Sequence, residues 1–501
     1  MVTTSQPNPS LSARLWNRRL DGYPDTGPRM GYLLVAVLAT VVLYYELYVG
    51  GGVAPLILAH YKMSFTYYVN ILVVSNLVGA FGSLAAGLAD RWGRANLVTY
   101  GLLLTGLLMF AVPSAPNTLV FAALSVVVGV VEGVILVATP ALVRDFSPQL
   151  GRATAMGFWT LGPVAGSLVV SAVAGATLTR LQAWQSQFHI VGVVGLVMFA
   201  VAFFGLRELS PGLRDQVMVS VRDRAVIEAR AKDHTAEVSH PWRQMMGRDI
   251  VAPALGISIF LLIYYSAVAF FTIYLTTIFG FSTSEANGIN TWYWAIDGVV
   301  LVAAGIASDR LRVRKPFMIV GTVVSVTMTI VFLSRATHPD TGYGTLVLII
   351  SLLAGGLAIA YAPWMAAFTE TIERRNPALT ATGLAVWGWL LRMVVTASLF
   401  FVPYVVSSMN ALVEAPAYLE AAKAAGASPP PALLEKLGEI KSAAAAAPGQ
   451  WQTWFWICVI AQVLFVPLML PLAGRWSPKA ARAEVEAHDR DVERLLGSGS
   501  S

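Results

Sequence analysis

The chain has 501 residues, of which 56% are apolar and only 12% are charged, and its mean hydropathy is +0.65. A soluble domain carries about 25% charged residues, so this composition excludes a water-soluble globule. The formal net charge of +6 comes from basic residues scattered over many short loops, which argues against a nucleic-acid partner.

Apolar runs of about 20 residues recur along the chain, and each can cross roughly 30 Å of hydrocarbon as a helix. The runs are continuous instead of alternating in polarity, which excludes barrel strands. We therefore predict an all-α polytopic membrane protein. Its predicted spans are 30–50, 66–88, 95–113, 117–142, 155–176, 187–207, 251–279, 286–308, 316–334, 344–368, 379–406 and 452–473.

Two long loops and the chain ends organise these spans. A cytoplasmic segment over 1–29 shows no cleavage pattern, so we expect the first helix to remain in the mature protein. The strongly charged stretch 208–250 predicts a cytoplasmic linker between two six-helix bundles. The remaining predicted units are the bundles 30–207 and 251–474, an extracytoplasmic insert at 409–450 with one or two short surface helices, and a cytoplasmic tail over 475–501.

The distribution of basic residues predicts the orientation in the membrane. Most of the 34 Lys and Arg residues fall in the two terminal segments and in alternate loops on one side of the predicted membrane. The positive-inside rule then places both termini in the cytoplasm, which fits an even number of crossings. We expect a multi-pass protein of the cytoplasmic (inner) membrane.

One charged signature occurs twice, at the same place in each half. AGLADRWGR follows the second predicted helix, and GIASDRLRVRK follows the eighth. Such a pair indicates parallel internal repeats. A carboxylate at a helix end can pair with a neighbouring helix in one conformation and release it in another. The predicted gating residues in the two loops are Asp90, Arg91, Gly93, Arg94, Asp309 and Arg310.

This signature resembles the G-x-x-x-D-R-x-G-R-R/K loop of the major facilitator superfamily, with Ala86 and Arg312 as departures. The resemblance implies a twelve-helix transporter of the bacterial type, in which two pseudo-symmetric six-helix bundles give alternating access. The fifth helix also carries Gly162, Pro163 and Gly166, similar to the family's G-P-x-x-G motif. We predict a gating role for these three, with plain helix packing as the alternative.

Four ionisable residues lie near the predicted membrane midplane, where a charge costs at least about 2.5–3.5 kcal/mol. We predict that Glu46, Glu132 and Asp297 are proton carriers, because desolvation and mutual repulsion favour their protonated forms. Arg392 is predicted to anchor a substrate anion or to pair with one carboxylate. The structural alternative is a buried ion pair that fixes the helix register.

Aromatic and polar residues at the same depth predict a substrate-binding surface, since they can stack on a flat solute and bond to its polar edge. Any one of them alone is more often ordinary packing. Besides Arg392, the predicted substrate-binding residues are Tyr45, Asn76, Tyr265, Trp294, Tyr361, Trp364 and Trp387.

Together these features predict a proton-coupled secondary transporter, either a symporter or an antiporter, that moves a small organic solute. An organic anion is favoured because of Arg392; the alternative is a proton-driven exporter of cationic or amphipathic drugs attracted by the three acids. The sequence contains no phosphate loop, H-E-x-x-H or nucleophile elbow, and its lone Cys458 cannot form a thiol metal cluster. We therefore expect no enzymatic activity, cofactor or metal, and a monomer whose partners are the solute, H+ and the bilayer.

Overall fold

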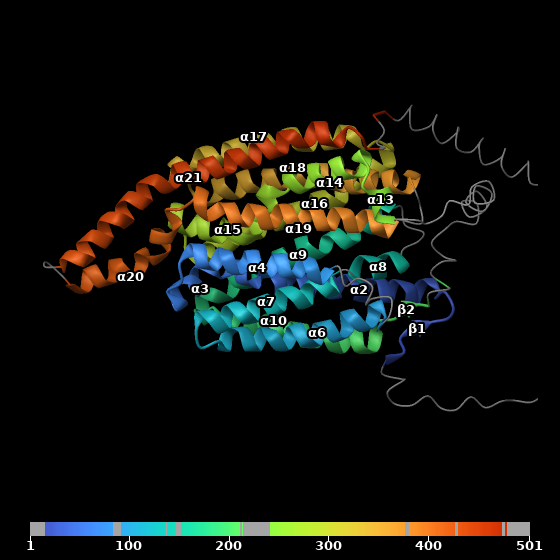
Figure 1. The fold of residues 1–501 in the computed structure, drawn as a ribbon, viewed down its shortest axis with the longest axis horizontal. Helices are drawn as coiled ribbons and strands as arrows, with labels where there is room; N and C mark the ends of the chain where they lie inside the picture. Colours follow the sequence, from blue (N-terminus) through green and yellow to red (C-terminus); the bar gives the residue numbers. More distant parts are fainter. Residues whose placement is uncertain are drawn as a thin grey trace, which may run out of the picture.

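The computed structural model describes residues 16–83, 92–136, 138–146, 152–210, 213, 241–375, 380–425, 429–472 and 476–477. Within these ranges, twelve helices are long and apolar enough to cross a membrane, and they lie roughly parallel in one bundle (Figure 1). The predicted number of spans is confirmed.

The first six spans form the N-terminal half. They are α2 (Thr26–Gly52), α4 (Phe65–Ser83), α6 (Arg94–Ala111), α7 (Thr118–Ile135), α9 (Arg152–Leu181) and α10 (Gln185–Gly205). Two shorter helices accompany them, α3 (Ala54–Tyr61) and α8 (Ala138–Asp145), and a 3-10 turn, η2 (Val112–Ser114), follows α6.

The other six spans form the C-terminal half. They are α14 (Arg248–Phe260) with α15 (Leu262–Ile278), then α16 (Thr283–Leu311), α17 (Lys315–Ser334), α18 (Tyr343–Arg375), α19 (Thr380–Val405) and α21 (Pro431–Met469). The seventh span is thus interrupted at Leu261. The half also contains α13 (Pro241–Met245), η3 (Arg335–Thr337) and α20 (Met409–Ala425).

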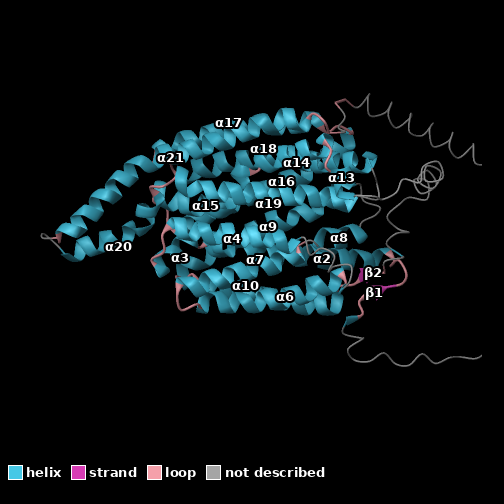
Figure 2. Ribbon diagram, in the orientation of Figure 1, coloured by secondary structure: helices cyan, strands magenta, loops and turns pink. Residues whose placement is uncertain are grey.

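A two-residue strand pair departs from the expected all-helical chain (Figure 2). The strands β1 (Arg19–Leu20) and β2 (Glu208–Leu209) run parallel, one before α2 and one after α10. The backbone of Glu208 donates to Arg18 O at 3.1 Å, and that of Ser210 donates to Leu20 O at 3.0 Å. The pair therefore ties the beginning of the N-terminal half to its end.

The two ends of the bundle differ in shape (Figure 1). We call the end with α3 and α20 the insert end, and the end with β1, β2, α8 and α13 the termini end. At the insert end, α20 packs against the first part of α21, and the two helices extend beyond the body of the bundle. The last span was predicted over 452–473, but its helix begins at Pro431. The second part of the insert and the span form one unbroken helix of 39 residues, α21.

Small residues allow the helices of each half to pack closely. A Cβ at Gly133 of α7 would collide with the backbone carbonyl of Gly79 on α4, and a Cβ at Gly356 of α18 would lie 2.6 Å from Ser325 N on α17. Without a hydrophobic driving force between helices in lipid, such close backbone contacts hold bundles together. The halves meet mainly where α9 packs on α16 and α4 packs on α19.

Candidate functional site

A cavity of about 70 Å³ lies between the two halves, lined by α2 and α9 on one side and by α15, α16, α18 and α19 on the other. It has room for several water molecules. Typical ligand pockets have about 300 Å³ or more, so the halves must separate to admit an organic solute. The aromatic and charged residues of the lining are Tyr44, Tyr48, Trp159, Tyr264, Tyr265, Asp297, Tyr361 and Trp387.

Asp297 is the charged side chain of this lining among the described residues. It lies on α16 and is only 3% exposed. Tyr264 and Tyr361, which also line the cavity, are within electrostatic range of its carboxyl group. Of the three predicted proton carriers, Asp297 is therefore the one that faces the space between the halves.

Glu46 lies away from the cavity, inside the N-terminal half between α2, α6 and α10. Thr105 Oγ1 donates to Glu46 Oε2 at 2.6 Å. The other oxygen, Oε1, occupies the space where a side chain at Gly195 of α10 would lie. The side chain is 2% exposed, and Oε1 has no hydrogen-bond partner in the described part of the chain. A buried carboxyl group with one free oxygen can hold a proton there.

Glu132 and Arg392 come from opposite halves of the protein. Glu132 on α7 is 1% exposed, and neither of its oxygens has a hydrogen-bond partner among the described residues. Arg392 on α19 reaches into the N-terminal half, where its Nη1 would lie 3.3 Å from a Cβ at Gly79. Glu132 is within electrostatic range of both Arg392 and Glu46. These three ionisable residues are absent from the cavity lining.

The predicted substrate-binding residues divide into two groups. Tyr265, Tyr361 and Trp387 line the cavity. The others lie outside the lining: Tyr45, Trp294 and Trp364 are buried in helix packing, and Asn76 is half-buried on α4. Depth in the membrane alone could not separate them, because the rotation of each helix decides which side chains face the cavity.

Four aromatic residues of the lining were missing from the predicted site: Tyr44, Tyr48, Tyr264 and Trp159. Tyr44 and Tyr48 are four residues apart, and so are Trp159 and Pro163, so each pair shares one helix face. This spacing was the available signal. The Trp159 and Trp387 rings meet across the halves with centroids 6.2 Å apart, which closes part of the cavity wall.

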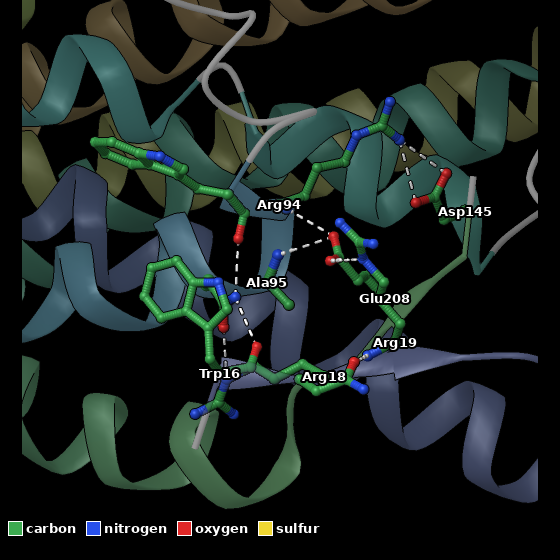
Figure 3. A network of polar contacts seen from close by, with 10 residues as sticks. Trp16, Arg18, Arg19, Arg94, Ala95, Asp145 and Glu208 are labelled. Carbon is green, nitrogen blue, oxygen red and sulfur yellow. Dashed lines mark hydrogen bonds and ion pairs between the residues drawn. The ribbon is translucent and has the colours of Figure 1, made fainter. Parts of the chain in front are cut away.

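The predicted gating loop of the N-terminal half is described from Trp92 onward, so Asp90 and Arg91 lie outside the described residues. Gly93 has φ +92°, a left-handed conformation that glycine adopts without strain. Figure 3 shows Arg94 donating to both carboxylate oxygens of Asp145, at 3.1 and 3.2 Å. Glu208 accepts the backbone N–H of Arg94 at 2.6 Å, which caps the start of α6.

The N-terminal segment joins the same network (Figure 3). Arg18 Nε donates to Asn96 Oδ1 at 3.0 Å, and Asn96 Nδ2 donates to Trp16 O at 2.8 Å. Burial lowers the pKa of the Arg18 guanidinium, whose Nη1 also donates to the carbonyl oxygens of Ala202 and Phe203. The segment from Trp16 to Arg18 is thus fixed to the beginning of α6 and the end of α10.

The C-terminal copy of the loop has a corresponding arrangement. Arg314 pairs with Asp309 at 2.7 Å and with Glu370 of α18 at 3.0 Å, while Arg310 is exposed. In each half, a basic residue of the loop therefore pairs with an acid on the fourth span or its extension. These ion pairs lie within one half and hold that half together as a unit.

The G-P-x-x-G residues lie where α9 packs on α2. A Cβ at Gly162 would lie 2.5 Å from Thr40 Cγ2, and a Cβ at Gly166 would lie 2.6 Å from Tyr44 Cβ. Both glycines allow this close approach, and Pro163 lines the cavity. The contact joins α9 and α2, two helices of the same half. Such a contact is what the alternative hypothesis of plain helix packing predicts for these glycines.

The profile of the Major Facilitator Superfamily matches residues 36–397 of the chain. Among curated proteins, the quinolone resistance protein NorB of Staphylococcus aureus, in strains JH9 and Newman, is 28% identical over 134 residues. That match covers 26% of this chain and 28% of the length of NorB.

Two solved structures of a bacterial homologue of the human lysosomal transporter Spinster have the same fold. The inward-facing, occupied form has a TM-score of 0.62 at 15% identity and covers 89% of this chain and 97% of its own. The inward-facing, unoccupied form has a TM-score of 0.61 at 16% identity and covers 91% and 100%.

Proposed function

Because the chain belongs to the Major Facilitator Superfamily, and is therefore a secondary transporter and not an enzyme, we propose that it exchanges an organic cation or amphipathic solute for protons. The observation that carries this proposal is that Asp297 lines the cavity between the halves, whereas Arg392 lies outside the lining and beside Glu132. This geometry favours the drug-export alternative over the organic anion that the sequence favoured.

The chemistry of the lining suits a positive charge. A carboxylate attracts an ammonium group directly, and the faces of tyrosine and tryptophan rings attract it through their quadrupoles. Asp297 lies in a lining that includes Tyr264, Tyr361 and Trp387. The name of NorB refers to resistance to a drug class, which agrees with export of an amphipathic compound.

An organic anion remains a second candidate because of one observation. Arg392 is within electrostatic range of Tyr44, Tyr48 and Tyr265, which all line the cavity. If Glu132 is protonated, the charge of Arg392 becomes available to a carboxylate in the enlarged cavity.

For the transport cycle we propose that the bundles 30–207 and 251–474 rock about the cavity, with both termini cytoplasmic and the insert end outside. Glu132 and Glu46 would carry the coupled protons within the N-terminal bundle. Arg392 belongs to the other bundle, and its electrostatic attraction to Glu132 would depend on whether Glu132 is protonated. The ion pairs that hold each bundle together support rigid-body motion of this kind.

A displacement experiment in proteoliposomes tests the charge preference. We expect tetraphenylphosphonium to bind to the wild type and benzoate to fail to displace it. Asp297→Asn should weaken tetraphenylphosphonium binding by at least about tenfold, whereas Asp340→Asn, which removes an exposed acid, should not. Binding of benzoate alone, abolished by Arg392→Gln, would establish the organic-anion candidate instead.

A further inference from the structure

The structure links the halves by hydrogen bonds at the insert end. Among the described residues, Asn287 Nδ2 of α16 donates to Gly52 O of α2 at 2.7 Å, and Ser284 Oγ donates to Gly175 O of α9 at 2.7 Å. Both bonds join one half to the other where α16 begins. An opening of the insert end must break them.

A third link comes from the beginning of α20, in the insert at 409–450. Asn410 Oδ1 accepts the backbone N–H of Thr66 at 2.9 Å, and Asn410 Nδ2 donates to Thr66 Oγ1 at 3.0 Å. Thr66 lies in the first turn of α4, where backbone N–H groups have no partner within the helix. Asn410 thus caps a helix of the opposite half.

The position of Asn410 is fixed from the side of the C-terminal half. The side chain of Gln450 on α21 accepts from Ser408 N at 2.9 Å and from Ser408 Oγ at 2.7 Å. Met409 is fully buried. The beginning of α20 is therefore attached to α21.

The partner of Asn410 is fixed from the other side. Ser64 caps the next residue of the same turn, because its Oγ accepts Tyr67 N at 3.2 Å. Phe65, beside Thr66, is buried and packs on Phe270 of α15 with ring centroids 5.7 Å apart. Polar and apolar contacts between the halves therefore meet at this one point.

From these contacts we propose that Asn410 is a positioning residue of the transport cycle, through which the insert closes the mouth of the transporter at the insert end. Closure lets Asn410 cap α4, and opening exposes the first turn of α4 to water. The bidentate contact stabilises the closed form relative to the open one. The inference rests on the fold and on the contacts between the halves, so it holds whichever solute is carried.

Distances between spin labels across the insert end test this role. Labels at Ala183 in the N-terminal half and Thr345 in the C-terminal half both occupy exposed positions, in a Cys458→Ala background. Asn410→Ala should raise the ratio of long to short distances about fivefold, in line with the loss of one or two hydrogen bonds.

Asn117→Ala is the matched control, since Asn117 caps its own helix α7 by accepting Val120 N at 2.9 Å. It should leave the distance distribution unchanged. Thr66→Val replaces the hydroxyl group by a methyl group and keeps the backbone N–H that Asn410 accepts, so it should give a smaller shift in the same direction. This variant is used if Asn410→Ala does not fold. The proposal would be overturned if the folded Asn410 or Thr66 variant had the same distance distribution as the wild type. It would also be overturned if the Asn117 control shifted the distribution equally.

Discussion

At the scale of single residues, the four charges of the membrane interior have different surroundings. Asp297 lines the cavity, Glu46 accepts a hydrogen bond from Thr105, and Glu132 is in electrostatic range of Arg392. A buried carboxyl group without a full set of partners favours its neutral form. The acids can therefore serve separate purposes, with solute binding at one and proton transfer at the others.

We expect Glu132→Gln and Glu46→Gln each to abolish proton coupling while leaving the affinity for the solute within about twofold, because neither side chain lines the cavity. Solute-dependent proton movement and equilibrium binding would be measured on the same proteoliposomes. Glu420→Gln, on the exposed face of α20, is the control. Retained coupling in both variants would rule these two acids out as carriers.

At the scale of helices, close packing through glycine is the feature most open to test. We expect Gly133→Ala to destabilise the protein by about 1–3 kcal/mol, because the added methyl group would meet the backbone of α4 at Gly79. Gly388→Ala is the control, since no atom lies within 4 Å of a Cβ at that position. Thermal unfolding in detergent would show a lower Tm for the first variant only; equal Tm values would contradict the packing argument.

The sequence predicted the number of spans because a length of apolar residues is sufficient to identify each helix. It did not predict the strand pair of β1 and β2, since a two-residue strand such as Arg19–Leu20 has no periodic signal. Nor could it show that α21 continues from the insert into the membrane. The run at Ala443–Ala447 favours a helix in any surroundings, and the structure places it within α21, which packs on α20 and on helices of the C-terminal half.

The site was predicted in part for a related reason. Depth along a helix follows from counting residues, so the sequence could predict which charged residues lie near the middle of a span. Rotation about the helix axis does not follow from depth, so Tyr45 was chosen where its neighbour Tyr44 lines the cavity. For Arg392, both an anion anchor and a partner of one carboxylate were predicted, because the sequence could not show that its guanidinium lies beside Gly79 of the other half.

At the scale of the whole molecule, two halves that are each held by internal ion pairs meet at a small aromatic cavity, and hydrogen bonds join them at the insert end. Rocking of such units would enlarge the cavity and expose it to each side in turn. A coupled exchange follows if the solute binds at Asp297 while protons leave the acids of the N-terminal half.

The most direct test of this exchange is proton movement in proteoliposomes that contain a pH-sensitive dye and are acidic inside. Addition of tetraphenylphosphonium outside should cause a rise in internal pH with the wild type, and no such rise with Asp297→Asn. A wild type whose internal pH does not respond to the cation, or responds only to benzoate, would contradict proton-coupled exchange of an organic cation.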